Sequence, residues 1–471
     1  MMMMMMTTMN KRRLMQALLL VWASLVTRGE SKEAGTCSFN EESAVDPNLH
    51  AFEFDVGDGP QNTLIYLEPD IQTFYPEEAD PEMRKKWPFS TASTGKFCNL
   101  SNQTVALYWQ SRTSGQRTLQ RYLAPWEASA LGTLEGHIFV FTTVDDANEI
   151  LTTMRVKQYP EAYYAYNPYQ ILTNPNPPPF LAAAEQELYT HWRQTLLFHK
   201  AYVKKTKKAY LANYLRSPAS HFMWPAAFFG QAHWVVTSET HFVDTPTTLD
   251  KLPPTEYARR LQHNTTVPLS EYRDSSLNLT LQVVSVAPRV LEISNFLSAT
   301  EIQHLLDQGD ALQREDSPIL DAIYRRAADV WRVDEALLRP REPDERPDVP
   351  GQFPLTEALR IMTFGPGQQY MEHADFNLDR LTDPSQPGRF ATLILYLQHA
   401  QRGGQTTLPR ASNAYSGKAL EFTPAVGNAF LVYNQLPDGN FDDSAMYGMT
   451  TVAEGESVLG FFYLWDPFLV V

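Results

Sequence analysis

The stretch that decides the fold is FGPGQQYMEHAD, residues 364–375. His373 and Asp375 stand two positions apart, so on a β-strand the imidazole and the carboxylate project to the same side. An imidazole and a carboxylate are two of the three ligands of the 2-His-1-carboxylate site that holds non-haem Fe(II). The third ligand is expected to be a histidine further along, yet the last histidine of the chain is His399. Fold and activity are therefore separate questions.

Length and composition indicate a globular chain with more than one domain. The 471 residues are 43% hydrophobic, which allows two or three sizeable cores. The net charge of −15 comes without a basic face, so nucleic acid and anionic membrane are not expected partners.

The N-terminal 30 residues have the pattern of a targeting segment. A basic group, Lys11–Arg13, precedes an apolar run over 14–26 that is short for a membrane span. This pattern predicts a signal peptide, with an uncleaved N-terminal anchor as the alternative. No later stretch is long and apolar enough to cross a membrane, so the expected location is the endoplasmic reticulum lumen or the outside of the cell.

Two further features agree with a secretory route. The acceptor pattern for N-glycosylation occurs at Asn99, Asn102, Asn264 and Asn278. Asn99 and Asn102 share one short turn, so only one of them is expected to carry a glycan. Cys37 and Cys98 are the only cysteines, and the sequence leaves open whether they form a disulfide or stay free thiols.

Periodicity divides the rest of the chain into three parts. Residues 50–156 read as strands, 157–285 as a Pro- and aromatic-rich linker and helical region, and 286–471 as a further β-rich domain. Alternating apolar residues predict strands over 103–109, 137–142, 289–297, 392–397 and 429–433. Helices are predicted over 181–216, 298–310 and 319–331.

Two features of the middle part are interpreted as structural. The basic run Lys204–Lys208 is interpreted as a solvated helix face, with a docking site as the alternative. His221, His233 and His241 match no metal-ligand spacing.

Several segments of 286–471 occur in the order found in one enzyme family. They are the Pro288–Ser298 entry, the GxGQxYxxHxD run, RFATLILYL at 389–397, GGQT at 403–406, and the strand pattern over 423–433. Together they resemble the prolyl 4-hydroxylase branch of the 2-oxoglutarate/Fe(II) dioxygenases. The resemblance implies a double-stranded β-helix, or jelly roll, with flanking helices.

The resemblance also implies a chemistry. It predicts Fe(II), 2-oxoglutarate and L-ascorbate as cofactors, and peptidyl proline as the substrate. His373 and Asp375 fall on two metal-ligand positions. Tyr370 and Thr406 fall near positions that line the co-substrate pocket.

The distal part of the family pattern is broken at two functional positions. Met446 stands where the third metal ligand is expected, and Ser457 stands where a lysine normally binds the far carboxylate of 2-oxoglutarate. Fe(II) in such a site prefers imidazole to a thioether. Losing the lysine removes a charge-assisted hydrogen bond worth roughly 1.5–3 kcal/mol. Impaired catalysis is expected, unless Met446 ligates weakly or another cation such as Lys418 replaces the lysine.

The N-terminal strands carry a second resemblance. FCN at 97–99, the strand ending at Trp109, and Thr133-x-x-Gly-His137-x-Phe139 resemble the β-domain of the von Hippel–Lindau tumour suppressor. This implies a small β-sandwich. Trp109, Thr133, His137 and Phe139 fall on positions that in that family hold hydroxyproline, with ordinary sandwich packing as the alternative.

Three functions remain open at this stage. The first is a prolyl 4-hydroxylase-fold protein with impaired catalysis that binds proline- or hydroxyproline-containing polypeptides. The second is an active peptidyl-proline 4-dioxygenase with an atypical site. The third is a non-enzymatic interaction protein that uses the β-sandwich alone. Iron binding separates the first two, and discrimination of hydroxyproline separates the first from the third.

Overall fold

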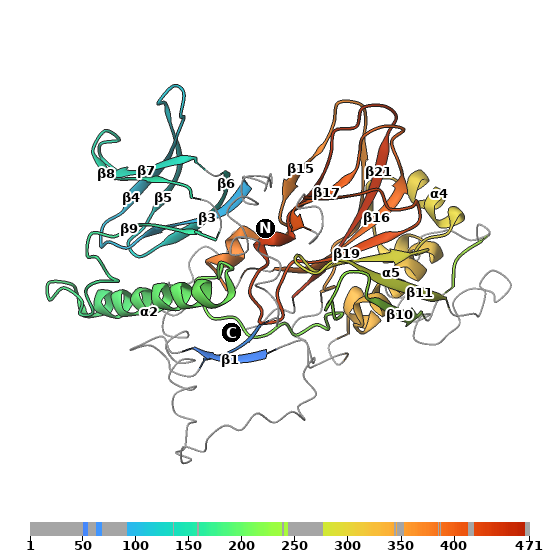
Figure 1. Ribbon diagram of the computed structural model, residues 1–471, viewed down its shortest axis with the longest axis horizontal. Coiled ribbons are helices and arrows are strands. Elements are labelled where there is room, and N and C mark those ends of the chain that lie inside the picture. The colour runs from blue at the N-terminus through green and yellow to red at the C-terminus, as the bar shows by residue number, and fades with distance from the viewer. Residues whose placement is uncertain are drawn as a thin grey trace, which may run out of the picture. The chain divides into compact units, whose positions relative to one another are not determined.

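The computed structural model shows a mainly β protein (Figure 1), as the sequence predicts. It describes residues 92–134, 136–157, 160–237, 240–243, 277–342, 345, 353–384, 386, 388–412 and 419–466, and the strand pair β1 and β2. β1 (His50–Phe54) pairs antiparallel with β2 (Thr63–Leu67). The segment 1–30, Cys37, Asn264 and Lys418 lie outside the described residues, so the expectations for them stay predictions.

Seven strands form a small β-sandwich. They are β3 (Ala92–Asn99), β4 (Val105–Gln110), β5 (Arg117–Leu123), β6 (Ala128–Leu134), β7 (Ile138–Thr143), β8 (Ile150–Arg155) and β9 (Tyr163–Tyr166). One sheet has the order β5-β4-β7-β8 and the other β6-β3-β9. Alternate residues of the two sheets bury a shared core around Phe97, Leu107 and Phe141. The strands predicted over 103–109 and 137–142 are confirmed as β4 and β7.

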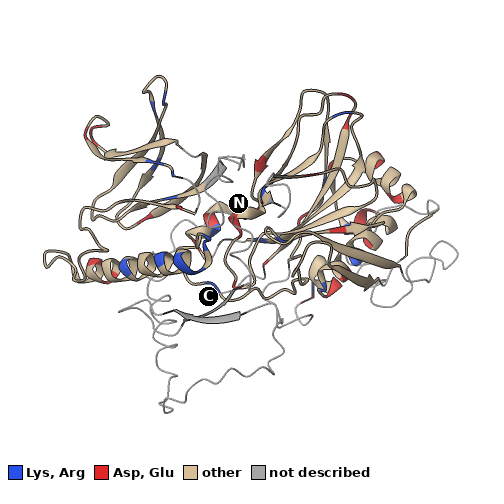
Figure 2. Ribbon diagram, in the orientation of Figure 1, with Lys and Arg blue, Asp and Glu red and all other residues tan. Residues whose placement is uncertain are grey.

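One long helix covers the outer face of the three-stranded sheet. This helix, α2 (Ala183–Thr206), packs Tyr189, Trp192 and Leu196 against Cys98 and Leu100. It ends earlier than the predicted residue 216, because Lys207 adopts a left-handed backbone conformation with φ of 58°. Lysine and arginine residues lie along α2, mainly in its C-terminal half (Figure 2).

The C-terminal part is a jelly roll built from two sheets. The larger sheet has the order β10-β11-β12-β19-β16-β21-β14-β13, and the smaller sheet has the order β15-β20-β17-β18. The larger-sheet strands are β10 (Ala232–Val236), β11 (Asn278–Ser285), β12 (Val290–Ser294), β13 (Ala311–Leu312), β14 (Leu359–Phe364), β16 (Arg389–Gln398), β19 (Ala429–Tyr433) and β21 (Ser457–Trp465). The smaller-sheet strands are β15 (Tyr370–His373), β17 (Thr406–Ser412), β18 (Ala419–Phe422) and β20 (Tyr447–Met449). β10 and β11 extend this domain before residue 286, where the sequence placed the boundary.

Two helices, α4 (Ala299–Gln308) and α5 (Pro318–Trp331), cover the outer face of the larger sheet (Figure 1). The predicted capping box is present, because Ser298 accepts from the Glu301 backbone N–H and Glu301 accepts from that of Ser298. Glu301 also pairs with the guanidinium of Arg326 from α5, and both side chains are fully buried. Both predicted helices are therefore confirmed. Among the described residues, no helix is long and apolar enough to cross a membrane.

Candidate functional site

The site expected from the sequence lies where β15 meets β20. These strands pair antiparallel, and His373 lies directly opposite Tyr447. Directly opposed residues project to the same face of a sheet. The imidazole and the phenol ring accordingly lie close together, with centroids 4.9 Å apart and planes tilted by 51°. β15 ends at His373, so Asp375 reaches the site from the loop that follows, not from the strand itself.

The Asp375 carboxylate is the buried centre of the site. Its Oδ2 accepts hydrogen bonds from the Thr392 hydroxyl at 2.6 Å and from the Tyr447 hydroxyl at 2.8 Å. Its Oδ1 faces His373 Nε2 at 3.2 Å and Arg389 Nη1 at 3.7 Å. The carboxylate is only 5% exposed, so these four groups are its environment.

The charge state of the pair follows from these contacts. Burial opposes a charge on His373, but hydrogen bonding and attraction to Asp375 more than offset it and hold the pKa of His373 above its ordinary value. Burial likewise opposes the charge on Asp375, and the same imidazole with Thr392 lowers the pKa of that carboxyl. Burial next to Asp375 raises the pKa of Tyr447 well above its ordinary value, so its phenol stays protonated and donates.

The structure corrects the assignment of the third ligand position to Met446. Met446 precedes β20, and the side chain that reaches Asp375 is that of its neighbour Tyr447. In the family pattern the histidine stands five residues before a valine, eight before a glycine and ten before the lysine, and Tyr447 has this spacing to Val452, Gly455 and Ser457. A phenol therefore stands where the family pattern has an imidazole.

This set of groups does not fit a resident Fe(II). His373 and Asp375 retain two donor atoms side by side, but the third group is a protonated phenol that donates to the carboxylate. The Arg389 guanidinium lies 3.7 Å from the oxygen that would face a metal, and it disfavours a divalent cation there. Within the described part of the chain, no three His, Cys, Asp or Glu side chains are grouped so that they could hold a metal.

His399 does not supply the missing imidazole. It follows the last residue of β16, whereas Thr392 near the start of that strand contacts Asp375. At ~3.3 Å per residue these positions are roughly 20 Å apart. The His399 ring contacts the carbonyl oxygen of Pro424.

The expected co-substrate residues are occupied by contacts with one another and with the core. The Thr406 hydroxyl hydrogen-bonds the Tyr396 hydroxyl at 2.8 Å, and both are buried. Ser457 Oγ, which is 1% exposed, accepts from the Ala400 backbone N–H at 3.2 Å. The Ser457 hydroxyl carries no charge, so it cannot replace the positive charge of the lysine expected at this position.

Aromatic rings fill the interior beside the carboxylate. Tyr370 lies against His373, with centroids 4.5 Å apart, and against Phe461, with centroids 5.2 Å apart. Phe461 is fully buried and stacks on Tyr447. The jelly-roll interior next to the site is thus an apolar core, which favours packing over binding of a dicarboxylate.

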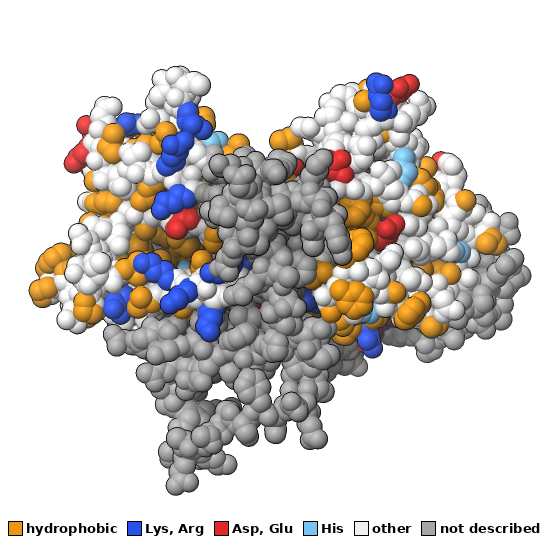
Figure 3. Space-filling model, viewed as in Figure 1, with side chains coloured by type: hydrophobic (Ala, Val, Ile, Leu, Met, Phe, Trp, Pro, Cys, Tyr) orange, Lys and Arg blue, Asp and Glu red, His pale blue; other side chains and the backbone are white. Residues whose placement is uncertain are grey.

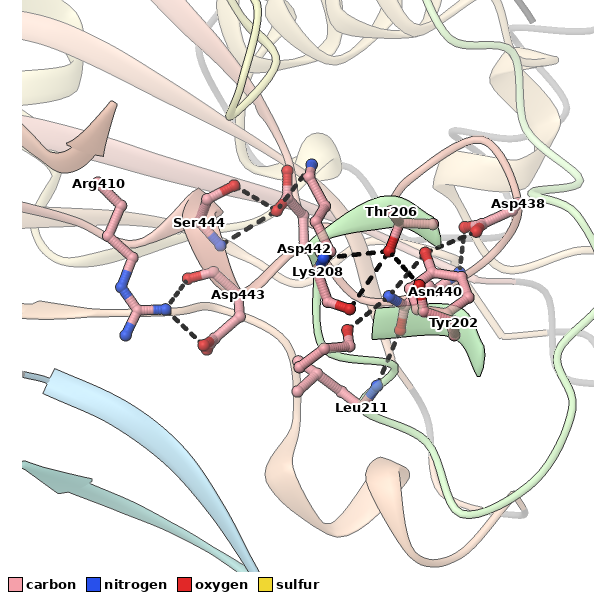
Figure 4. A network of polar contacts seen from close by, with 11 residues as sticks. Tyr202, Thr206, Lys208, Leu211, Arg410, Asp438, Asn440, Asp442, Asp443 and Ser444 are labelled. Carbon is pink, nitrogen blue, oxygen red and sulfur yellow. Dashed lines mark hydrogen bonds and ion pairs between the residues drawn. The ribbon is translucent and has the colours of Figure 1, made fainter. Parts of the chain in front are cut away.

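The loop that precedes Tyr447 is held by α2 and the segment after it (Figure 4). Asp438 accepts from the Tyr202 hydroxyl at 2.8 Å, and Asp442 pairs with Lys208 at 3.6 Å. All four side chains are buried. Asn440 adds hydrogen bonds from its amide to Tyr202 and to the carbonyl oxygen of Ala209.

The sandwich also contacts this loop. The Thr94 hydroxyl of β3 donates to Asp443 at 3.0 Å, and Arg410 of β17 pairs with the same carboxylate. A buried apolar cluster also joins residues of these parts of the chain; it includes Ala130, Leu211, Phe376, Leu381 and Phe441. The position of Tyr447 in the site is therefore supported by residues from three parts of the chain.

Three of the four residues predicted to hold hydroxyproline lie together at one end of the sandwich. The Thr133 hydroxyl and His137 Nδ1 are 3.0 Å apart, and the Trp109 and His137 rings meet edge to face at 5.7 Å. Burial and the nearby Arg112 lower the pKa of His137, which favours the neutral ring. Phe139 is different: it is 3% exposed and packs on Phe97, so it belongs to the core and not to a pocket wall.

The described sequon residues differ in accessibility. The Asn99 side chain is fully buried, and its amide donates to the carbonyl oxygens of Gln103, Leu123 and Ala124. A glycan on that nitrogen is incompatible with these contacts, so of the two neighbouring sequons Asn102 is the better candidate. Asn102 and Asn278 are exposed and remain candidates.

Cys98 is a free, fully buried thiol among the described residues. Burial raises its pKa to about 12, so it is unreactive in this state.

Comparison with known proteins supports the dioxygenase resemblance. No family model matches the chain. The probable prolyl 4-hydroxylase 10 of Arabidopsis thaliana is 25% identical over 203 residues, which cover 39% of this chain and 70% of that protein. Prolyl 4-hydroxylase 5 of the same plant is 24% identical over 196 residues, covering 37% of this chain and 67% of that protein.

The solved structures that match are less similar to this chain in sequence than these relatives. The viral collagen prolyl hydroxylase of Paramecium bursaria Chlorella virus-1, solved with 2-oxoglutarate, has a TM-score of 0.28 at 17% identity and covers 38% of this chain and 96% of that one. A prolyl-4-hydroxylase from Pseudomonas putida has a TM-score of 0.25 at 14% identity, covering 38% and 84%. The part of the chain that forms the jelly roll is thus similar in sequence to prolyl 4-hydroxylases.

Several residues around the carboxylate were not found from the sequence. Thr392, Arg389 and Tyr447 all contact Asp375, and the Asn434 amide donates to the Thr392 hydroxyl at 3.1 Å. These residues lie on β16, after β19 and on β20, so no local pattern joins them to Asp375. Only the order of strands in the two sheets brings them together.

Proposed function

We propose that this chain, with its prolyl 4-hydroxylase-type domain, is a non-catalytic member of that group that binds proline-containing polypeptides in the secretory pathway. In this proposal the chain recognises the kind of polypeptide that its relatives are named for hydroxylating. It does so without carrying out the oxidation.

One observation carries the proposal: the Tyr447 hydroxyl donates to Asp375 at the position of the expected third metal ligand. A catalytic site of this type needs a carboxylate whose lone pairs are free to bind the metal. Here two hydroxyls donate to Oδ2 of the buried carboxylate, and Oδ1 faces the His373 imidazole and the Arg389 guanidinium. The replacement of the carboxylate-binding lysine by Ser457 points in the same direction.

The site nevertheless keeps an accessible surface. The side chain of His373 is 33% exposed, and that of its strand neighbour Met371 is 68% exposed. A partly open surface with an exposed thioether can contact an apolar ring such as that of proline. The secretory location rests on the basic and apolar N-terminal pattern and on the exposed sequons Asn102 and Asn278.

The proposal is tested by iron content and 2-oxoglutarate decarboxylation of the purified full chain. The His373→Ala variant is the control, because it removes the one remaining histidine of the site. We expect both proteins to show the same background decarboxylation and the same substoichiometric iron. Stoichiometric iron with turnover above that control would instead support an active dioxygenase with an atypical site.

A second candidate function is recognition of hydroxyproline by the sandwich. It is favoured by the grouping of Trp109, Thr133 and His137, which offers a ring surface beside two hydrogen-bonding groups. Titration of the full chain with matched proline and 4-hydroxyproline peptides tests it. Tighter binding of the hydroxylated peptide, lost in Thr133→Val, supports the function, and equal affinities exclude it.

A further inference from the structure

The two outermost strands on one side of the sandwich border a groove. β8 ends the four-stranded sheet and β9 ends the three-stranded sheet, so each pairs with a single neighbour among the described strands. Between them lies a cavity of about 620 Å³. Its lining comes from the end of β8 with the residues after it, and from the start of β9 with Glu161 before it: residues 153–157, 161 and 163–165.

The floor of the groove is a tyrosine that joins the two edges. The ring of Tyr164 packs on Phe97 in the sandwich core. Its hydroxyl accepts from the Lys157 backbone N–H at 3.0 Å and donates to the Glu161 carbonyl oxygen at 3.1 Å. The spacing of the two walls is thereby fixed before any ligand binds.

The wall formed by β8 presents backbone groups to the groove side. Val156 makes both of its backbone hydrogen bonds to the β7 side, with His137 and Gly136. In an antiparallel ladder the hydrogen-bonding direction alternates along the strand. The backbone N–H and C=O groups of Thr153 and Arg155 therefore point away from β7, to the free edge. Such an edge accepts an added strand.

The side chains in the lining select the charge of that strand. Arg155 and Lys157 are exposed cations in the groove, and Glu161 is the single carboxylate of the lining. The Arg112 and Arg155 guanidinium groups are neighbours: a nitrogen of each lies within 4 Å of the position that a Cβ atom on Gly136 would occupy. Several lysine and arginine side chains are visible on the sandwich in Figure 3. This excess of positive charge complements an acidic ligand.

We propose that the groove between β8 and β9 binds an extended polypeptide segment that carries a glutamate or aspartate side chain. The segment adds to the free edge of β8 by backbone hydrogen bonds, and its carboxylate lies between Arg155 and Lys157. The inference does not depend on the function proposed for the jelly roll, because none of the groove residues belongs to that domain.

The test uses the full chain and three fluorescent peptides in an anisotropy titration. The first is a short Val/Thr peptide with a central glutamate, the second has glutamine there, and the third is the glutamate peptide N-methylated at alternate residues. Wild-type protein is expected to bind the glutamate peptide about tenfold more tightly than the glutamine peptide, because a charge-assisted hydrogen bond is lost. The N-methylated peptide is expected not to bind, because it cannot donate to a strand edge.

Variants separate charge from fold. Arg155→Gln/Lys157→Gln should bind the two unmethylated peptides equally, whereas Arg121→Gln/Lys200→Gln, which removes two exposed cations elsewhere, should keep the preference. Circular dichroism and melting of both variants check the fold. The proposal is overturned if wild type shows no glutamate preference, if Arg155→Gln/Lys157→Gln retains it, or if the N-methylated peptide binds equally well.

Discussion

Removing one hydroxyl from Tyr447 tests whether Asp375 is held by hydrogen bonds instead of by a metal. The Tyr447→Phe change keeps the ring and its packing on Phe461 and His373. It deletes only the hydrogen bond to Asp375 Oδ2, which is 2.8 Å long and buried. The carboxylate would retain Thr392 on the same oxygen.

The magnitude follows from the charge of the acceptor. A buried hydrogen bond to an ionised group contributes about 1.5–3 kcal/mol, and one between neutral groups about 1 kcal/mol. We therefore expect Tyr447→Phe to lower the free energy of unfolding by about 2 kcal/mol. Tyr396→Phe is the matched control, because Tyr396 is equally buried in the same core and its hydroxyl bonds the neutral Thr406. It should cost about 1 kcal/mol.

Urea unfolding of the two variants and the wild-type chain measures the difference. The midpoint and slope should give Tyr447→Phe the larger loss, with an unchanged slope. If Tyr447→Phe costs no more than Tyr396→Phe, the hydroxyl is not a partner of the charged carboxylate, and the reasoning fails.

Three further outcomes are expected. Burial lowers the pKa of His199 well below its ordinary value, so the imidazole stays neutral in the folded state and is protonated in the unfolded chain. The free energy of unfolding should therefore fall as pH drops below about 6.5, by up to ~1.4 kcal/mol per pH unit. Urea titrations of His199→Gln at the same pH values should show a smaller fall. Asp442→Asn should destabilise the chain by about 3 kcal/mol in the same assay, because buried Lys208 loses its counter-charge, and a loss below about 1 kcal/mol would contradict this. Glycopeptide mapping of chain secreted from cultured cells should find glycan on Asn102 and none on the buried Asn99, and a glycan on Asn99 would show that its pocket is open.

Much of the fold could be predicted from local patterns. Alternation located β4, β7, β16 and β19, and the Ser298–Glu301 capping box located the start of α4. These signals succeed because each strand buries one face and each helix needs its first N–H groups satisfied. The end of α2 was missed because it depends on one left-handed residue, Lys207, which carries no glycine or proline signal.

The site was only partly predictable. His373 and Asp375 could be named, since their spacing is local. The third position was assigned one residue too early, at Met446, and a shift of one residue on a strand exchanges its two faces. The pairing of His373 with Tyr447 resolves that register, and only the three-dimensional arrangement shows it.

If Tyr447 replaces a metal ligand, an imidazole at this position should raise the affinity for iron, and equilibrium binding of Fe(II) under anaerobic conditions measures that affinity. The comparison is between the wild-type chain and Tyr447→His, which restores an imidazole opposite His373. We expect weak binding by wild type and an affinity more than about tenfold higher for Tyr447→His, because a third ligand is added. Tight stoichiometric binding by wild type that is lost in His373→Ala would contradict it.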